Sequence, residues 1–115
     1  MKIEKFEDLV SWQKALELTV EIYKIFEQSK DFGFKDQIQR ASVSIMNNIA
    51  EGFERKSNKE LLQFFYIAKG SAAEVRSMLI LSLELKKINQ NQYDKLISLN
   101  SEISKLLSGF IKSIS

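Results

Sequence analysis

Three glutamates are the most obvious candidates for chemistry in this sequence. Glu51 and Glu54 lie close together, and Glu74 follows later in the chain. Carboxylates that project from neighbouring helices can hold Mg²⁺, which prefers oxygen ligands. In the alternative interpretation, Glu51 pairs with Arg40 or Arg55, and Glu74 forms a hydrogen bond across a helix interface.

The surrounding motif does not favour magnesium. All-α nucleotide pyrophosphatases bind the ion with Glu-Glu-x-x-Glu followed by Glu-x-x-Asp. This chain lacks both the doubled first glutamate and the final aspartate. It also contains no His and no Cys, which excludes thiol and histidine nucleophiles, zinc fingers and haem ligation through histidine. We therefore predict that the protein is not an enzyme and has no catalytic residue, cofactor or metal.

Two polar motifs lie within predicted helices. Asn47 and Asn48 occupy mid-helix positions, where asparagine is a mediocre helix former. We expect a buried amide that fixes the register of two helices, and a ligand-binding amide is the alternative. Gly70-Ser71-Ala72-Ala73 is predicted to let two helices approach closely. It does not lie between a strand and a helix, as a phosphate-binding loop would.

Cations that could contact a phosphate backbone concentrate in the middle of the chain. The candidates are Lys35, Arg40, Arg55, Lys56, Lys59, Lys69 and Arg76. We expect Arg55 and Lys56 at one end of the folded domain, where a phosphate backbone can reach them. The alternative is an ordinary solvated surface of mixed charge, because the net charge is only +2.

Four segments with helical apolar periodicity must position these side chains. We predict helices over residues 8 to 28, 35 to 54 and 58 to 87, and a fourth that follows residues 89 to 92 and frays near Ser115. Asp8 is the predicted first cap, and Ser57 with Glu60 has the form of a capping box. Proline is absent, so nothing interrupts these helices. The prediction is an all-α fold, an antiparallel up-and-down four-helix bundle.

The same periodicity selects a candidate core. The side chains that we expect to be mostly buried are Trp12, Leu16, Ile45, Ile49, Phe65 and Ala72. The first and third helices each carry two apolar seams, which is more than a small isolated bundle needs. This excess predicts contacts between subunits.

Length and composition limit the organisation of the chain. Its 115 residues correspond to one domain over residues 1 to 115, and 44% hydrophobic residues suffice for a packed core and exclude disorder. Neither a signal peptide nor a membrane span is expected, because no apolar run is long enough. With no cysteine to mark an oxidising compartment, we expect a cytoplasmic protein without a membrane partner.

Three segments carry a family resemblance: residues 6–15 (FEDLVSWQKA), 37–53 (QIQRASVSIMNNIAEGF) and 67–74 (IAKGSAAE). They resemble the four-helix-bundle proteins of the 23S rRNA intervening-sequence family. The most specific part is Ser-Ile-x-x-Asn-Ile-Ala-Glu-Gly at residues 44–52. The resemblance covers residues 6 to about 85. The predicted fourth helix resembles that of the family only in being a helix.

The resemblance implies a bundle that assembles as a ring-like homopentamer and has no catalytic site. The accessory protein of diversity-generating retroelements has the same fold, and its basic surface engages nucleic acid and a reverse transcriptase. The implied partners are therefore further copies of this chain and RNA or a nucleic-acid-processing protein. The motif positions with implied structural roles are Trp12, Ser44, Asn48, Glu51, Gly52, Ser71 and Glu74.

Two hypotheses follow. One is a nonenzymatic, oligomeric scaffold associated with nucleic acid, in which the weakly binding cationic patches of several subunits together increase the affinity. The other is a homo-oligomeric interaction or structural module without a nucleic-acid role. Clustering of the cations Arg40, Arg55, Lys56, Lys59 and Lys69 on one face favours the first hypothesis, whereas their neutralisation by Glu51, Glu54 and Glu60 favours the second.

Overall fold

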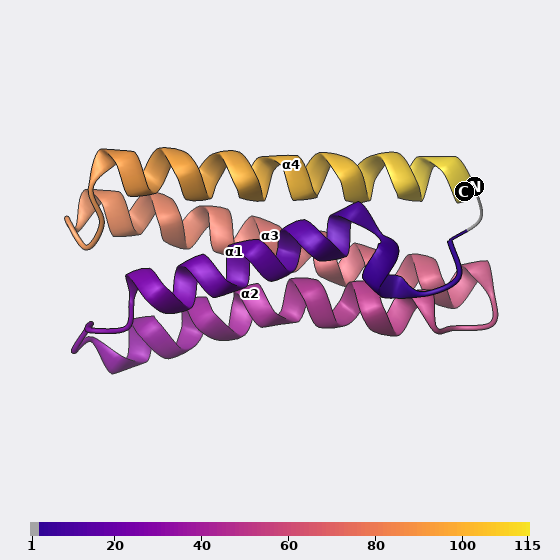
Figure 1. The fold of residues 1–115 in the computed structure, drawn as a ribbon, viewed down its shortest axis with the longest axis horizontal. Coiled ribbons are helices and arrows are strands. Elements are labelled where there is room, and N and C mark those ends of the chain that lie inside the picture. Colours follow the sequence, from indigo (N-terminus) through magenta and orange to yellow (C-terminus); the bar gives the residue numbers. More distant parts are fainter. Residues whose placement is uncertain (1–2) are drawn as a thin grey trace.

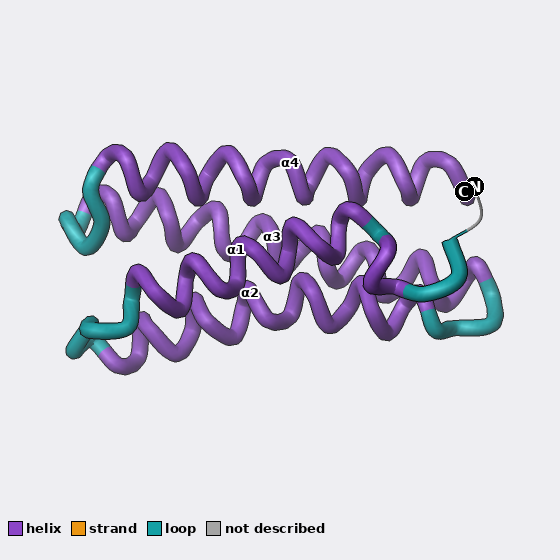
Figure 2. The backbone as a smooth tube through the Cα atoms, viewed as in Figure 1, coloured by secondary structure: helices purple, strands orange, loops and turns teal. Residues whose placement is uncertain are grey.

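Four long helices make up almost all of the structure, a computed structural model that describes residues 3–115. A single 3-10 turn, η1 (Phe6–Asp8), precedes α1 (Val10–Ile25). The helices α2 (Phe32–Phe53), α3 (Asn58–Glu84) and α4 (Gln90–Ile114) follow. Successive helices run in opposite directions (Figure 1) and are joined by short loops (Figure 2). The predicted antiparallel four-helix bundle is confirmed.

The helices form a four-sided bundle in chain order. α1 packs against α2 and α4, and α3 packs against the same two helices. Within the described residues, α1 does not contact α3 and α2 does not contact α4. The bundle therefore has four side faces, and the face between α1 and α2 lies opposite the face between α3 and α4.

The helix starts follow the capping chemistry of the sequence. The side chain of Ser57 accepts a hydrogen bond from the Glu60 N–H, and Asn89 forms a complete capping box with Gln92. α2 begins three residues before the predicted start, because Asp31 caps it through the Phe34 N–H.

The predicted Asp8 cap is wrong. Asp8 belongs to the 3-10 turn, and α1 starts after Leu9 without a side-chain cap. This turn brings the Phe6 ring edge-on to the Trp12 ring, with centroids 5.2 Å apart. This aromatic contact anchors the chain at the entry to α1.

α3 ends before the predicted position, and a residue just beyond its end has a left-handed backbone conformation. Lys86 has φ 59°, and the Lys87 and Lys86 N–H groups donate to the carbonyls of Ser82 and Leu83. This is the Schellman pattern of helix termination. The helix therefore stops at Glu84, and the two lysines lie beyond its end, near the free carbonyls.

The core confirms most of the predicted burial. Ile45, Ile49, Phe65 and Ala72 are buried. The prediction for Leu16 is wrong, since 38% of this residue is exposed, and Trp12 is only half-buried. The inward face of α1 is formed by Ala15, Leu18 and Ile22. Because α1 packs against two long helices, α2 and α4, one of its two apolar seams remains on the surface.

None of the helices in the described residues has a stretch that is both long and apolar enough to cross a membrane.

Candidate functional site

The motif residues of α2 and α3 meet in a polar seam along the interface between these helices. Ser44 Oγ lies 2.8 Å from Ser71 Oγ. Asn48 Nδ2 donates to the Ser44 carbonyl at 2.8 Å and to Ser44 Oγ at 3.0 Å. Asn48 therefore holds the hydroxyl of Ser44, one turn earlier on α2, in the position from which it bonds to Ser71 of α3. We call Gln37, Ser44, Asn48, Ser71 and Glu74 the α2–α3 seam.

The seam matches the predicted register role in part. Asn48 is half-buried and acts through Ser44, whereas Asn47 is exposed and contributes no such contact. Farther along, Gln37 Nε2 donates to Glu74 Oε2 at 3.3 Å. Every member of the seam therefore has a hydrogen-bond partner inside the chain.

Gly52 ends the motif at the closest approach of the two helices. It is buried, and a Cβ placed on it would lie 2.9 Å from both Phe64 Cβ and Phe65 Cδ1. Any side chain at this position would collide with α3. Gly52 therefore permits the close packing of α2 on α3.

The three glutamates do not form a metal site. Glu51 lies 4.0 Å from Arg55, and Glu74 accepts the bond from Gln37. Gln37 and Glu51 are 14 residues apart on α2, so roughly 21 Å of helix separates the two carboxylates. Within residues 3–115 no three acidic residues come close enough to hold an ion.

The predicted cations divide into a group and two separate residues. Arg55, Lys56 and Lys59 are exposed around the turn between α2 and α3. Arg40 lies on the outside of α2, about four turns away, and forms an ion pair with Asp36 at 2.8 Å. Lys69 is half-buried farther along α3. The structure therefore does not bring all five side chains to one face.

The three cations at the turn between α2 and α3 differ in how far neighbouring groups neutralise their charge. The Arg55 guanidinium faces Glu51 and lies 4.5 Å above the centre of the Phe64 ring, so both contacts occupy it within the chain. Within the described residues, neither Lys56 nor Lys59 forms an ion pair. These two lysines are the cations of the group that remain available to a phosphate.

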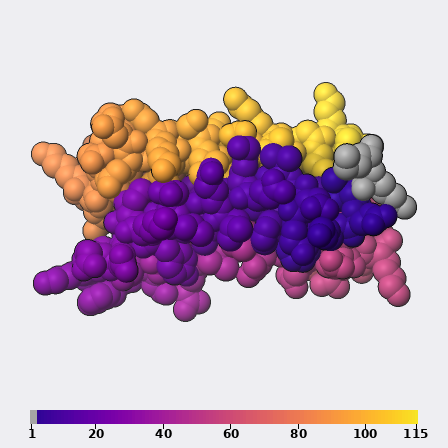
Figure 3. All heavy atoms as spheres, viewed as in Figure 1, coloured from indigo at the N-terminus to yellow at the C-terminus, as the bar shows by residue number. Residues whose placement is uncertain are grey.

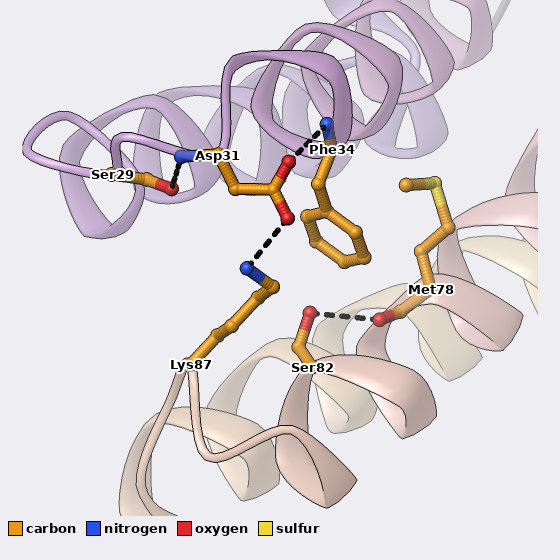
Figure 4. A network of polar contacts seen from close by, with 6 residues as sticks. All are labelled: Ser29, Asp31, Phe34, Met78, Ser82 and Lys87. Carbon is orange, nitrogen blue, oxygen red and sulfur yellow. Dashed lines mark hydrogen bonds and ion pairs between the residues drawn. The ribbon is translucent and has the colours of Figure 1, made fainter.

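The opposite end of the bundle holds a separate polar cluster, drawn in Figure 4. Asp31 Oδ2 accepts a hydrogen bond from Lys87 Nζ at 2.9 Å, and the Lys87 ammonium lies 5.1 Å from the centre of the Phe34 ring. The bond from Lys87 and the Phe34 N–H lower the pKa of the Asp31 carboxyl. This cluster joins the α1–α2 loop to the α3–α4 loop.

Sequence reasoning missed a groove between α3 and α4. It has a volume of about 510 Å³ and is lined by Ala72, Ala73, Arg76, Ile97, Ser98, Asn100, Ser101 and Ser104. Asn100 is buried, and its Nδ2 donates to the Ala72 carbonyl at 2.9 Å. The sequence does contain a sign that Asn100 is buried, because position 100 shares the helical face of Leu96, Ile103 and Leu107.

The chain is similar to known proteins in both sequence and fold. The family model described as 23S rRNA-intervening sequence protein matches residues 7–109. A crystal structure of a protein with unknown function from the S23 ribosomal protein family of Bacteroides thetaiotaomicron is 33% identical in sequence, with a TM-score of 0.85. That alignment covers 90% of this chain and 99% of the other. No curated protein matches this chain significantly.

The family match spans all four helices and contains both sides of the α2–α3 seam. The solved relative has the same fold over nearly its whole length. The chain therefore belongs to the family of 23S rRNA-intervening sequence proteins.

Proposed function

We propose that this protein is a nonenzymatic scaffold that works as a homo-oligomer. The observation that carries the proposal is the distribution of exposed apolar side chains. Most of them lie on α1 and α3: Val10, Leu16, Val20 and Tyr23 on α1, and Tyr66, Ile67, Ile80 and Leu81 on α3. Leu85 follows the end of α3, and Phe32 at the start of α2 is also exposed. Such a concentration of apolar surface is typical of protein–protein contact sites.

The candidate site supports a structural rather than a catalytic role. Ser44 bonds to Ser71 and Gln37 bonds to Glu74 across the α2–α3 interface, and Asn48 bonds to Ser44 within α2. The most prominent carboxylates, Glu51 and Glu74, are far apart and each has a partner. These contacts support a role in fixing the register of two helices.

Light scattering of the purified chain tests the scaffold directly. We expect a mass several times that of one chain at micromolar concentration, and the family resemblance gives a homopentamer as the specific expectation. A stable monomer across a dilution series would refute the proposal. A defined oligomer other than a pentamer would refute only the expected copy number.

A second candidate function is association with RNA in the bacterial cytoplasm, alone or together with a nucleic-acid-processing protein. Lys56 and Lys59 favour it, because they lie exposed on one turn and have no ion-pair partner within the described residues. One subunit offers few such cations, so binding would be weak per subunit, strongly salt-dependent and insensitive to sequence. An oligomer would add these contacts together.

Fluorescence anisotropy with unrelated RNAs tests the second candidate. Replacing Lys56 and Lys59 by Ala should lower the affinity for all RNAs to a similar degree and flatten the dependence of log K on log salt. A matched control replaces Lys24 and Lys30 by Ala, two lysines near the other end of the bundle. No binding even at ~50 mM salt, where electrostatic attraction is strong, would leave the scaffold without an RNA role.

A further inference from the structure

The groove between α3 and α4 contains a buried polar group that lacks a partner. Asn100 of α4 is only 2% exposed, and its Nδ2 donates to the Ala72 carbonyl of α3 at 2.9 Å. Its Oδ1 is buried as well and accepts no hydrogen bond from the described residues. Buried polar atoms are nearly always paired, because an unpaired acceptor costs free energy. The unpaired oxygen therefore indicates a donor that comes from outside the fold.

The bond to α3 fixes the orientation of this amide. A backbone carbonyl only accepts hydrogen bonds, so the amide atom that faces Ala72 is the nitrogen. Turning the amide over would bring two acceptors together and leave the nitrogen unpaired. Asn100 lines the groove although it is almost wholly buried, so it forms part of the groove floor. The group that this floor offers to a ligand is therefore an acceptor.

Hydroxyl groups of α4 form one wall of the groove. Ser98, Ser101 and Ser104 all line it, and the six residues from the first to the last correspond to roughly 9 Å of helix. Each hydroxyl can both donate and accept. This wall therefore suits the polar edge of a small molecule.

The charge of the groove is that of one cation. Arg76 lines it from α3, one turn after Ala72, and forms no ion pair within residues 3–115. Its planar guanidinium suits the two oxygens of a carboxylate. A phosphate monoester would bring up to about two negative charges to this single cation. The groove therefore fits an anion of single charge.

The same charge balance describes the donor that Oδ1 requires. Among the described residues that line the groove there is no Asp or Glu. An ammonium group placed beside Asn100 would lose water without gaining an opposite charge. A neutral N–H group avoids this cost and still donates to the oxygen.

The size and the remaining wall suit a compact organic molecule. The volume of about 510 Å³ lies within the range of roughly 300 to 1,000 Å³ that is usual for ligand pockets. Ala72, Ala73 and Ile97 contribute apolar surface. A ligand with a small apolar body can therefore pack against this wall.

The other flank of α4 has a different character. There Lys14 pairs with Glu102 at 3.2 Å, and Glu21 pairs with Lys95 at 3.3 Å. These ion pairs join α1 to α4 on the side seen in Figure 3, where α1 crosses the front of the molecule between α4 above and α2 below. Within the part of the chain that the structure describes, no ion pair joins α3 to α4. The open, polar side of α4 is therefore the one toward α3.

We infer that the α3–α4 groove binds a small monocarboxylate that carries a neutral N–H donor, such as an amide, a urea or an indole. The N–H group donates to Asn100 Oδ1, and the carboxylate pairs with Arg76. The serine hydroxyls border the polar edge of the ligand, and its apolar body lies against Ile97. This site is separate from the proposed scaffold, and neither depends on the other.

Indoleacetate is the probe, because it joins one carboxylate to one ring N–H through a compact apolar body. Saturation-transfer NMR, observed on the probe, measures its binding to the full chain. We expect saturable binding with a Kd of the order of 1 mM, which is usual for a molecule of this size. The N-methyl derivative lacks only the donor and should bind about tenfold more weakly, because it leaves the Asn100 oxygen unpaired.

Two variants and a control locate the probe. Arg76→Gln should lower the affinity about tenfold, because it removes the charged partner of the carboxylate. Ser101→Leu should lower it by filling the groove. Both positions are exposed, so the circular dichroism of the variants should be unchanged. Lys112→Gln removes an exposed cation of α4 outside the groove and should leave the affinity unchanged.

Three outcomes of the binding experiments would overturn the inference. No saturable binding up to ~10 mM, well above the expected Kd, would show that water alone bonds to the Asn100 oxygen. Equal affinities for indoleacetate and its N-methyl derivative would show that the oxygen does not recognise the donor. An affinity unaffected by Arg76→Gln and Ser101→Leu would locate the probe elsewhere.

Light scattering with the probe present separates this site from the scaffold. We expect the mass of the protein to be the same with and without indoleacetate. A probe that lowers the mass would show that a contact between subunits fills the groove, which would overturn the ligand site and leave the scaffold proposal intact.

Discussion

Gly52 is the residue at which the packing of α2 on α3 leaves the least room. A Cβ on Gly52 would approach Phe64 Cβ, which cannot move without shifting the backbone of α3. We predict that Gly52→Ala destabilises the fold by about 1 to 3 kcal/mol, the usual cost of overpacking a core. Chemical denaturation followed by circular dichroism measures this change.

Gly109 is the matched control for Gly52. It is exposed within α4, and a Cβ at this position would meet nothing within 4 Å. Gly109→Ala should therefore stabilise the protein by about 0.5 to 1 kcal/mol, because alanine loses less backbone entropy on helix formation. If both substitutions shift the denaturation midpoint in the same direction, close helix packing does not explain Gly52.

Asp31 makes the stability of the bundle depend on pH at the acidic end. Its pKa is lowered in the folded state, first by the hydrogen bond from Lys87 and then by the Phe34 N–H. The ionised carboxylate therefore stabilises the fold above the unfolded-state pKa of about 3.9, and this contribution is lost as pH falls through the lowered folded-state value. Asp31→Asn should lower the melting temperature at neutral pH, and the difference should shrink below about pH 4.

The asparagine variant isolates the charge, because asparagine caps helices about as well as aspartate. The control background is Lys87→Met, which removes the partner of Asp31. In that background Asp31→Asn should have a much smaller effect, since the two residues act as a pair. An undiminished effect would mean that the Lys87 bond does not carry the stabilisation.

At the scale of the elements, the end of α3 holds a backbone conformation that lysine seldom adopts. Lys86 has φ 59°, which crowds the Cβ of any L-residue and is free of cost only for glycine. We predict that Lys86→Gly raises the free energy of unfolding by about 0.5 to 1 kcal/mol. Lys86→Ala removes the same charge but keeps a Cβ, so it should give no gain. Equal effects of the two substitutions would show that charge, rather than φ, matters.

The capping residues explain why the elements could be predicted so well. Ser57 and Asn89 each bond to a backbone N–H three residues away, so the information for these helix starts lies within one turn of sequence. The start of α1 was predicted less well, because the 3-10 turn at Phe6–Asp8 depends on how Phe6 packs against Trp12. Local signals do not report such packing.

At the scale of the whole molecule, one core holds the four helices together, and Ile49 lies in its α2 wall with no exposed surface. Ile49→Ala should destabilise the bundle by about 2 to 5 kcal/mol, because the side chain leaves a cavity as well as losing its burial. The control is Ile67→Ala, at a position 51% exposed. A loss below about 0.5 kcal/mol at Ile49 would be a surface-like effect and would exclude it from the core.

The four helices, most of their caps, the family and the buried positions Ile45, Ile49, Phe65 and Ala72 could all be predicted from the sequence. Helical period and capping act over a few residues, and the family motif at residues 44–52 is contiguous. These features can therefore be predicted without knowing which helices are neighbours.

Which apolar seam of α1 faces inward, and which polar groups meet, depends on how the helices pack together. Leu16 and Ala15 are adjacent in sequence, and α1 exposes one and buries the other because it packs between α2 and α4. The Ser44–Ser71 bond joins residues that are 27 positions apart, and the small residues of the α3–α4 groove come from two helices. Such contacts depend on the relative rotation of whole helices, which periodicity within one helix leaves free.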